Sequence, residues 1–448
     1  MMKNMTPENI ARVCSGTYFG PEDIKQKSVT SITTDSRVVD EGGLFVALRG
    51  ERVDGHSFIP QVREKGVLCV VVEEKPETEC PYILVESTYQ AMKDMATFYR
   101  GQLSCKVVGI TGSVGKTSTK EMIAGVLGAK YNVLKTAGNY NNELGVPMTL
   151  FRVREEHEVA VVEMGISDFG EMSRLTSMVK PDICVITNIG ECHLENLGDR
   201  DGVLRAKTEI FECLNPDGTA VLNGQDDKLI TIENVNGKKP YFFGSEDCYA
   251  ENIVSRGLLG TSCVIRSKDM VIDADICVQG VHQVKNAMAA VCVAQLLGLT
   301  KEEMEKGIKS VVALPGRGQI IAGDRYTLID ESYNANPISM KATLDALAQT
   351  EGRRVAILGD MFELGENSDA LHAEVGSYAG KSGIDLLICI GENAKHIYAG
   401  AEMKNKIHFD TKEEFLSQKD ELLETGDTIL LKASHGMQFE AMKKELVG

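Results

Sequence analysis

The chain has 448 residues, of which 43% are hydrophobic and 25% charged, and its net charge at pH 7 is −17. This length predicts about three domains, and the charge argues against nucleic-acid binding, which needs clustered cationic side chains to neutralise phosphates. The N-terminus lacks an apolar signal core, and no run approaches the ~18 apolar residues of a membrane span. We therefore expect a cytoplasmic protein whose cysteines are reduced and pack as small hydrophobic groups.

The first two blocks of the chain differ in their pattern. Residues 1–100 contain short apolar runs separated by Gly-rich turns, which predicts a small α/β domain. Residues 101–312 begin with an apolar strand at 105–110. Further strands are predicted at 159–162 and 183–187, with amphipathic helical stretches between them. This alternation is typical of a parallel sheet.

The third block, residues 313–448, opens with the sequence LPGRG at 314–318, which breaks the pattern and predicts a linker. Strand–helix alternation then resumes and is typical of a Rossmann-like domain. The predicted strands are 327–330, 354–358, 386–390 and 428–431. The fold class is therefore α/β, with a central parallel-sheet domain between a small N-terminal α/β domain and a Rossmann-like C-terminal domain.

The strongest local signal is GITGSVGKTS at 109–118, which lies between the strand at 105–110 and a predicted helix at 119–129. Such a strand–loop–helix context is what a phosphate-binding loop requires, because glycines let the backbone N–H groups wrap a phosphate. Lys116 can reach the β- and γ-phosphates, and the hydroxyl of Thr117 or Ser118 can ligate Mg²⁺. The alternative is a Gly-rich turn with an incidental lysine, since Ile110 stands where the strict motif begins with glycine.

Polar residues follow two of the predicted strands, at the sheet edge where open α/β sheets bind ligands. Glu163 follows the strand at 159–162 and could hold Mg²⁺, although a solvated strand-end carboxylate is the alternative. His193 follows the strand at 183–187 and could be either a metal ligand or a structural histidine. Lys207 lies on a predicted helix, where spacing alone favours a solvated lysine over a functional one.

The order of phosphate loop, strand-end Glu163 and N-I-G-x-x-H at 188–193 resembles the Mur ligases, which add amino acids to peptidoglycan precursors. Further segments are similar to the branch of this family that adds D-alanyl-D-alanine. They include T-D-S-R from 34, N-Y-N-N-E-L-G-V-P from 139, D-E-S-Y-N-A-N-P from 330 and G-D-M-F-E-L-G from 359. They occur in the family's order between residue 34 and about residue 440.

The resemblance implies a role for each domain and for individual residues. The first domain would bind the UDP substrate, the second ATP, and the third the acceptor. The implied catalytic residues are Lys116, Glu163, His193 and Lys207. The implied ATP-binding residues are Gly112, Ser113, Gly115, Lys116, Thr117, Ser118, Asn286, Arg317 and Glu331. Ligands of Mg²⁺ would be Thr117, Glu163, His193 and Lys207 as a carbamate. Substrate would meet Ser36, Arg37, Asn139, Asn142, Tyr333, Asn334 and Asn336.

The chain departs from the family pattern at two positions. Glu331 stands where the family has aspartate, and His435 stands where it has arginine. Imidazole and guanidinium differ in charge and donor geometry, so the contact made by His435 stays open. The contact made by Glu331 stays open as well.

The implied reaction uses ATP to turn the carboxylate of UDP-MurNAc-tripeptide into an acyl phosphate, which the amine of D-alanyl-D-alanine attacks. Within the superfamily, the alternatives are lysine- or diaminopimelate-adding enzymes and folylpolyglutamate synthetases, against which the segment at 330–337 argues. A P-loop switch or motor ATPase, or a UDP-sugar-binding protein without catalysis, would be of another class. The third residue of the tripeptide and the base that deprotonates the amine stay open, and a monomer is the family expectation.

Overall fold

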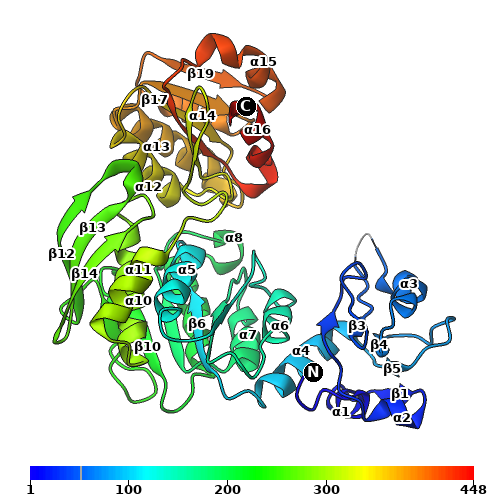
Figure 1. Cartoon of the computed structure of the whole chain (residues 1–448). Coiled ribbons are helices and arrows are strands. Elements are labelled where there is room, and N and C mark those ends of the chain that lie inside the picture. The colour runs from blue at the N-terminus through cyan, green and yellow to red at the C-terminus, as the bar shows by residue number, and fades with distance from the viewer. Residues whose placement is uncertain (51–52, 448) are drawn as a thin grey trace.

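A computed structural model describes residues 1–50 and 53–447 and contains three sheets, of five, nine and six strands. Each sheet forms the centre of one domain, and the domains follow one another along the chain (Figure 1). The predicted three-domain α/β architecture is therefore confirmed. Among the described residues, no helix is both long and apolar enough to cross a bilayer.

The N-terminal sheet has the order β1-β5-β4-β3-β2 and is parallel except for the β1–β5 pair. Its central strand β4 is buried along its whole length, because alternate side chains enter two different apolar clusters, Val70 on one face and Val71 on the other. The strands are β1 Thr17–Phe19, β2 Ile32–Thr33, β3 Leu44–Val46, β4 Cys69–Val72 and β5 Tyr82–Leu84, with helices α1 Pro7–Val13, α2 Glu22–Lys25 and α3 Ile59–Glu64.

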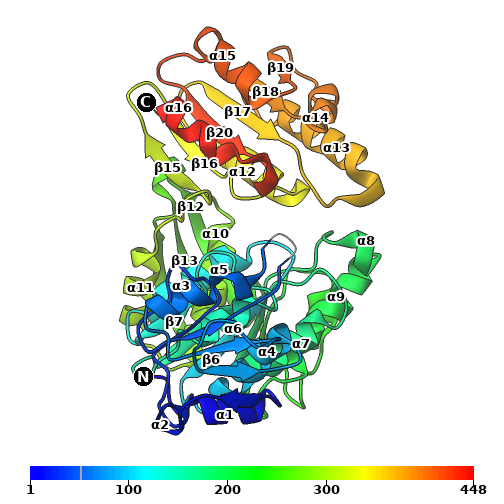
Figure 2. The ribbon, with the colours of Figure 1, turned by 90° about the vertical axis from the view of Figure 1, so that its right-hand side faces the viewer.

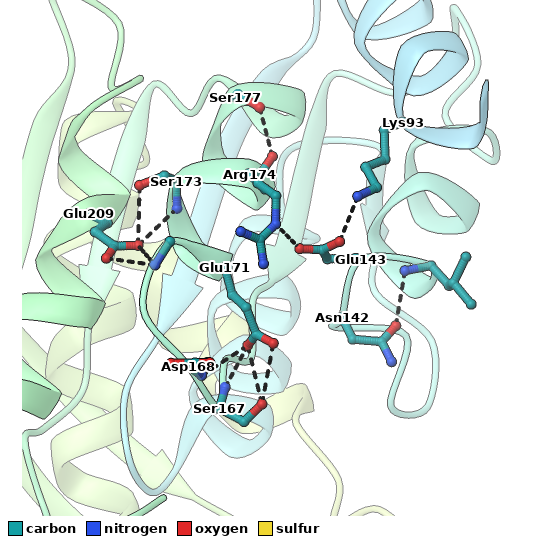
Figure 3. Close-up of polar contacts among 12 residues, drawn as sticks. Lys93, Asn142, Glu143, Ser167, Asp168, Glu171, Ser173, Arg174, Ser177 and Glu209 are labelled. Atoms are coloured by element: carbon teal, nitrogen blue, oxygen red, sulfur yellow. Dashed lines mark hydrogen bonds and ion pairs between the residues drawn. The ribbon is translucent and has the colours of Figure 1, made fainter. Parts of the chain in front are cut away.

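Helix α4, Thr88–Arg100, connects the N-terminal domain to the central domain. It contacts α1 on one side and α6 and α7 of the central domain on the other. The Tyr99 hydroxyl donates to the Val153 carbonyl at 2.7 Å. Figure 3 shows Glu143 between Lys93 of α4 and Arg174 of α7, and Glu143 forms ion pairs with both cations.

The central sheet has the order β14-β13-β12-β11-β10-β9-β6-β8-β7. Strands β6 to β11 form its parallel part, and β12 to β14 form an antiparallel ribbon at one end. The strands are β6 Lys106–Thr111, β7 Val133–Lys135, β8 Val159–Glu163, β9 Ile183–Ile186, β10 Thr219–Asn223, β11 Tyr241–Phe243, β12 Cys248–Ser255, β13 Thr261–Ser267 and β14 Met270–Ile276.

Helices cover both faces of the parallel part. Apolar side chains of α5, α10 and α11 pack on one face, and those of α7 and α9 pack on the other. The helices are α5 Lys116–Leu127, α6 Gly145–Leu150, α7 Glu171–Val179, α8 Leu194–Leu197, α9 Arg200–Thr208, α10 Gln283–Leu296 and α11 Lys301–Ser310.

The C-terminal sheet has the order β15-β16-β20-β17-β18-β19 and is parallel except for β15. Helices α12 to α14 pack on one face, and α15 and α16 lie on the other. The elements are β15 Gln319–Ala322, β16 Thr327–Asp330, α12 Pro337–Ala348, β17 Arg354–Gly359, α13 Ser368–Lys381, β18 Leu386–Ile390, α14 Ala394–Gly400, β19 Lys406–Phe409, α15 Lys412–Leu422, β20 Thr428–Lys432 and α16 Lys443–Val447.

The C-terminal domain lies over the central domain, and the ribbon β12–β13 reaches up to it (Figures 1 and 2). At the tip of the ribbon, the Ser255 hydroxyl donates to the side chain of Gln349 at the end of α12. Leu258 packs against the apolar cluster of the C-terminal domain. The two domains therefore meet at the ribbon tip as well as at the chain connection.

Two details differ from the sequence-based expectation. Helix α5 begins at Lys116 rather than at residue 119, because Gly115, with φ of 82°, turns the chain directly into the helix. The sequence pattern predicts a parallel sheet for the whole block, whereas β12 to β14 form an antiparallel ribbon. Its signal is the alternation of buried side chains in β13, at Thr261, Cys263 and Ile265.

Candidate functional site

The glycine-rich loop follows β6 and is held by the segment that follows β9. The Asn188 side-chain oxygen accepts hydrogen bonds from the backbone N–H groups of Ser113 at 3.1 Å and Val114 at 2.9 Å. The Thr187 hydroxyl donates to the Val114 carbonyl at 2.6 Å. A Cβ atom on Gly112 would lie 1.9 Å from the Thr187 hydroxyl oxygen, so only glycine fits there. Sequence reasoning missed Asn188 and Thr187 as supports of the loop, although they lie at the end of a predicted strand.

Lys116, in the first turn of α5, folds back over this loop. Its ammonium group donates to the carbonyls of Gly112 at 2.8 Å and Ser113 at 3.4 Å. Burial lowers the pKa of Lys116, while the nearby Glu163 carboxylate acts in the opposite direction. The amine that sequence analysis assigned to ATP phosphates is therefore at the loop, where it contacts carbonyl groups that a phosphate could replace.

Glu163, at the end of β8, is 1% exposed and surrounded by polar groups. The Thr117 hydroxyl donates to its two oxygens at 2.9 and 3.1 Å, and the Asn141 amide donates at 2.9 Å. The Lys120 ammonium lies 3.7 Å from the same carboxylate. The Glu163 backbone N–H donates to the Thr136 hydroxyl at 3.0 Å. The structure thus joins the predicted pair Thr117 and Glu163, and it adds Lys120, Asn141 and Thr136, which sequence reasoning missed.

Lys207 on α9 is 1% exposed and has no hydrogen-bond or ion-pair partner in the part of the chain that the structure describes. Burial lowers its pKa to about 8, and the Lys116 cation contributes. The interpretation of Lys207 as a solvated helix lysine is therefore wrong. A buried, unpaired amine with a lowered pKa is unusual for a structural residue and typical of functional sites.

His193 lies between the central and C-terminal domains. It precedes α8 with a left-handed backbone, φ 52°, and its Nδ1 atom lies 3.5 Å from a carboxylate oxygen of Glu363. Burial lowers the pKa of His193, and the Glu363 carboxylate raises it. The cations of Lys207 and Lys116 also lower this pKa. His193, Lys116 and Lys207 are therefore close enough to share one electrostatic environment.

Asn286 on α10 faces the N-terminal end of α5. Its side-chain oxygen accepts from the Thr119 hydroxyl at 2.8 Å, and its amide donates to Gln283 at 2.7 Å. A small hollow beside these residues has both aliphatic and polar walls. It is lined by Ser118, Glu121, Val278, Gln283, Val311, Val312, Ala313, Leu314 and Arg317.

Arg317, in the predicted linker, lies over the Tyr333 ring at 3.8 Å from its centroid. The His435 ring stands 5.4 Å from the same ring, centroid to centroid. Glu331 forms an ion pair at 3.4 Å with the buried Lys432. His435 thus contacts Tyr333, an expected substrate-binding residue on which Arg317 lies. Glu331 contacts Lys432, which was not among the expected site residues.

Ser36 and Arg37 lie in the N-terminal domain, apart from the phosphate loop. The Lys65 ammonium donates to both of their carbonyl groups at 2.8 Å. Asp35 binds the Arg37 guanidinium, whose side chain is 83% exposed. Arg37 is therefore oriented by a neighbour and still accessible to a ligand.

Three of the expected substrate-binding amides already bond to the backbone. The Asn142 side chain, labelled in Figure 3, accepts from the N–H groups of residues 144 and 145, and the Asn336 side chain caps α12. The Asn334 side chain accepts from the N–H of the next residue at 2.9 Å. Asn139 is exposed. Asn142 and Asn336 thus shape loops, and their free amide N–H groups are what they could offer to a substrate.

Comparison with known proteins connects this geometry to a family. Residues 28–100 match the catalytic domain of the Mur ligase family, residues 110–294 the Mur ligase middle domain, and residues 316–435 the Mur ligase glutamate ligase domain. The UDP-N-acetylmuramoyl-tripeptide–D-alanyl-D-alanine ligase of Bacillus subtilis (strain 168) is 37% identical over 100% of this chain and 99% of that protein. The chain belongs to the Mur ligase family.

Solved structures of Mur ligases agree with this assignment. MurF from Acinetobacter baumannii has a TM-score of 0.91 at 32% identity, with 100% of this chain and 99% of that chain covered. MurF from Thermotoga maritima in complex with ADP has a TM-score of 0.82 at 29% identity, with 93% and 96% covered. The resemblance predicted from the motifs is confirmed, and the chain is a ligase rather than a P-loop switch or motor.

Proposed function

We propose that this Mur ligase joins D-alanyl-D-alanine to UDP-MurNAc-tripeptide in an ATP- and Mg²⁺-dependent reaction that passes through an acyl phosphate. The full-length similarity to enzymes of that name supports the substrates. The observation that carries the chemistry is the contact between Thr117, in the first turn of the phosphate-loop helix, and the buried carboxylate of Glu163.

The donor set around Glu163 fits a magnesium ion. A hydroxyl and a carboxylate, both oxygen donors, already meet within 3.1 Å, and Mg²⁺ prefers oxygen ligands. We assign Thr117 and Glu163 as its ligands, with His193 and a carbamylated Lys207 completing the set. A carbamate would convert a buried, unpaired cation into an anionic oxygen donor. When bound, the metal would offset negative charge on the reacting phosphates.

The phosphate loop would bind and orient ATP. Its backbone N–H groups and the start of α5 favour a phosphate electrostatically. Lys116 would exchange its carbonyl partners for the β- and γ-phosphates, and Arg317 would approach them from the linker. Asn286 would contact the adenine, and Glu331 the ribose.

The ligase step needs an acyl phosphate that is protected from water until the amine attacks. We assign residues 1–100 to binding the UDP portion, with Ser36 and Arg37 at the diphosphate. Residues 101–312 would bind ATP, and residues 313–448 the acceptor. The substrate would then extend across the junction lined by Asn139, Asn142, Tyr333, Asn334 and Asn336. We further propose that the protein acts as a monomer in the cytoplasm.

The test is ADP release by purified protein with Mg-ATP, UDP-MurNAc-tripeptide and D-alanyl-D-alanine. ADP should form in a one-to-one ratio with a new amide, and single amino acids should not replace the dipeptide. Lys116→Ala should lower the rate by at least about 10²-fold, the scale for removing a donor at developing negative charge. Lys306→Ala, at an exposed lysine on α11, is the matched control. ADP release without amide, or an unaffected Lys116→Ala variant, would refute the proposal.

A further inference from the structure

The backbone of Glu363, in the loop after β17, is left-handed with φ of 61°. This conformation is unfavourable for a residue with a Cβ atom and persists when the surroundings enforce it. Such residues often mark functional sites. The side chain of Glu363 is 74% exposed, so its burial in a core does not explain the conformation.

Both neighbours of Glu363 are fixed to the C-terminal domain. The Phe362 N–H donates to the hydroxyl of the buried Ser434 at 2.9 Å, and Leu364 packs against the apolar cluster under α12 and α13. One residue earlier, the Met361 N–H donates to the buried His372 at 2.9 Å. The loop therefore holds Glu363 at a set position on the C-terminal edge of the sheet, where α/β domains bind ligands.

From this position Glu363 crosses to the central domain. Its carboxylate lies 3.5 Å from Nδ1 of His193, which is also left-handed. A second contact supports this approach, because a Cβ atom on Gly190 would lie 3.1 Å from Ile338 at the start of α12. The carboxylate thus reaches the electrostatic environment that His193 shares with Lys116 and Lys207.

The charges of this environment suit anions. Lys116 and Arg317 are cationic side chains around a site that takes ATP and a carboxylate, and they would repel the ammonium form of an incoming amine. Glu163 cannot guide that amine, because it is buried and bound to Thr117, Asn141 and Lys120. Glu363 is an exposed carboxylate supplied by the domain assigned to the acceptor.

We propose that Glu363 binds the free ammonium group of the acceptor dipeptide and delivers it to the carboxyl group activated next to His193. In this arrangement, the contact with His193 is the position that the carboxylate occupies until an ammonium group replaces the imidazole. The inference rests on the proposed function, since it requires an amine acceptor.

The test compares Glu363→Gln with Glu363→Asp and with Glu366→Gln, a matched control at an exposed glutamate three residues along the same loop. Loss of a hydrogen bond to a charged group corresponds to about 10- to 100-fold in affinity. We expect KM for D-alanyl-D-alanine to rise by that factor in Glu363→Gln, with KM for ATP unchanged. KM for the dipeptide in Glu363→Asp should lie between the values of Glu363→Gln and wild type. In Glu366→Gln this KM should equal that of wild type.

Hydroxylamine in place of the dipeptide separates this inference from the proposed function. As an uncharged nucleophile it should trap the acyl phosphate as a hydroxamate at the wild-type rate in Glu363→Gln, which also shows that the variant is folded. An unchanged KM for the dipeptide would overturn the inference. So would a slower hydroxamate reaction with weaker Mn²⁺ binding, because it would make Glu363 a metal ligand. If wild-type protein forms neither amide, hydroxamate nor ADP, the proposed function itself fails.

Discussion

The Lys120 ammonium on α5 lies 3.7 Å from a carboxylate oxygen of Glu163 at the end of β8, and both residues are 1% exposed. The Lys120 ammonium also contacts Glu121 at 3.1 Å and donates to the Thr136 carbonyl at 2.9 Å. A cation therefore lies beside the carboxylate that we assign to the metal, next to the oxygen that also accepts from Thr117. Removing the Lys120 cation should first lower the stability of the folded protein.

We predict that Lys120→Met lowers the free energy of unfolding by about 3 kcal/mol, because removing one partner leaves a buried carboxylate without its cation. The double variant Glu163→Gln/Lys120→Met should lose less free energy of unfolding than the sum of the losses in the two single variants. Urea unfolding of the four proteins measures both effects. Strict additivity would show that the two side chains do not interact.

Lys207 should make stability depend on pH. Its pKa in the folded protein, about 8, is below its usual 10.5, so the folded state releases this proton first. The cost of burying the cation is complete below about pH 8 and disappears as the pH rises to 10.5. In CO₂-free buffer, Lys207→Met should therefore be more stable than wild type at pH 7, by on the order of 3 kcal/mol. This advantage should shrink between pH 8 and 10.5, and a constant difference would contradict the assignment.

A separate measurement tests the carbamate. After incubation with ¹³C-labelled bicarbonate, wild-type protein should show a carbamate signal by NMR, and Lys207→Arg should not. The wild-type signal should be accompanied by a rise in unfolding temperature, because the modification removes the buried cation.

Gly112→Ala should weaken nucleotide binding. At φ of 148° an alanine would lie in a backbone region that costs about 1–3 kcal/mol, and its Cβ atom would clash with Thr187 at 1.9 Å. We expect the affinity for ADP, measured by calorimetry, to fall at least about tenfold. Gly237→Ala is the control, since Gly237 also has a positive φ, 80°, but no atom within 4 Å of the added Cβ. Equal loss in both variants would point to backbone strain alone.

Arg317 should depend on the Tyr333 ring beneath it. Stacking of a guanidinium on an aromatic ring is worth about 0.5–2 kcal/mol, so Tyr333→Leu should raise KM for ATP about two- to thirtyfold. Tyr333→Phe keeps the ring and should change KM for ATP little. Arg317→Lys should resemble Tyr333→Leu, because a lysine neither stacks flat nor donates in a fork. Steady-state kinetics with ATP as the varied substrate measure these KM values. Equal KM values in Tyr333→Leu and Tyr333→Phe would show that the ring does not support Arg317.

The phosphate loop and several parallel strands could be predicted from the sequence, because these depend on local patterns. The predicted strands correspond to β6, β8, β9, β16, β17, β18 and β20, whereas β7, β10, β11 and β19 were not predicted. The strands at 327–330 and 386–390 coincide with β16 and β18, and their buried apolar runs determine them without reference to the rest of the chain. The contact of Thr117 with Glu163 followed from the rule that ligands gather at the carboxyl ends of parallel strands.

Other features depend on distant segments and could not be read from local pattern. The burial of Lys207 results from packing of α9 against the sheet, and a lysine on an amphipathic helix gives no sign of it. Lys120 resembles any helix lysine until Thr136 and Glu163 are seen around it. The approach of Glu363 to His193 requires the relative position of two domains, which no spacing within either segment encodes.

The ribbon tip at Ser255 and the linker at 314–318 are two separate attachments between the central and C-terminal domains. A rigid body held at two points retains one rotational freedom, about the line through them. If both attachments persist during turnover, the C-terminal domain can move relative to the central domain only by rotation about this axis. Glu363 would then move along a single arc about this line, so that one angle would set the distance of its carboxylate from the central domain.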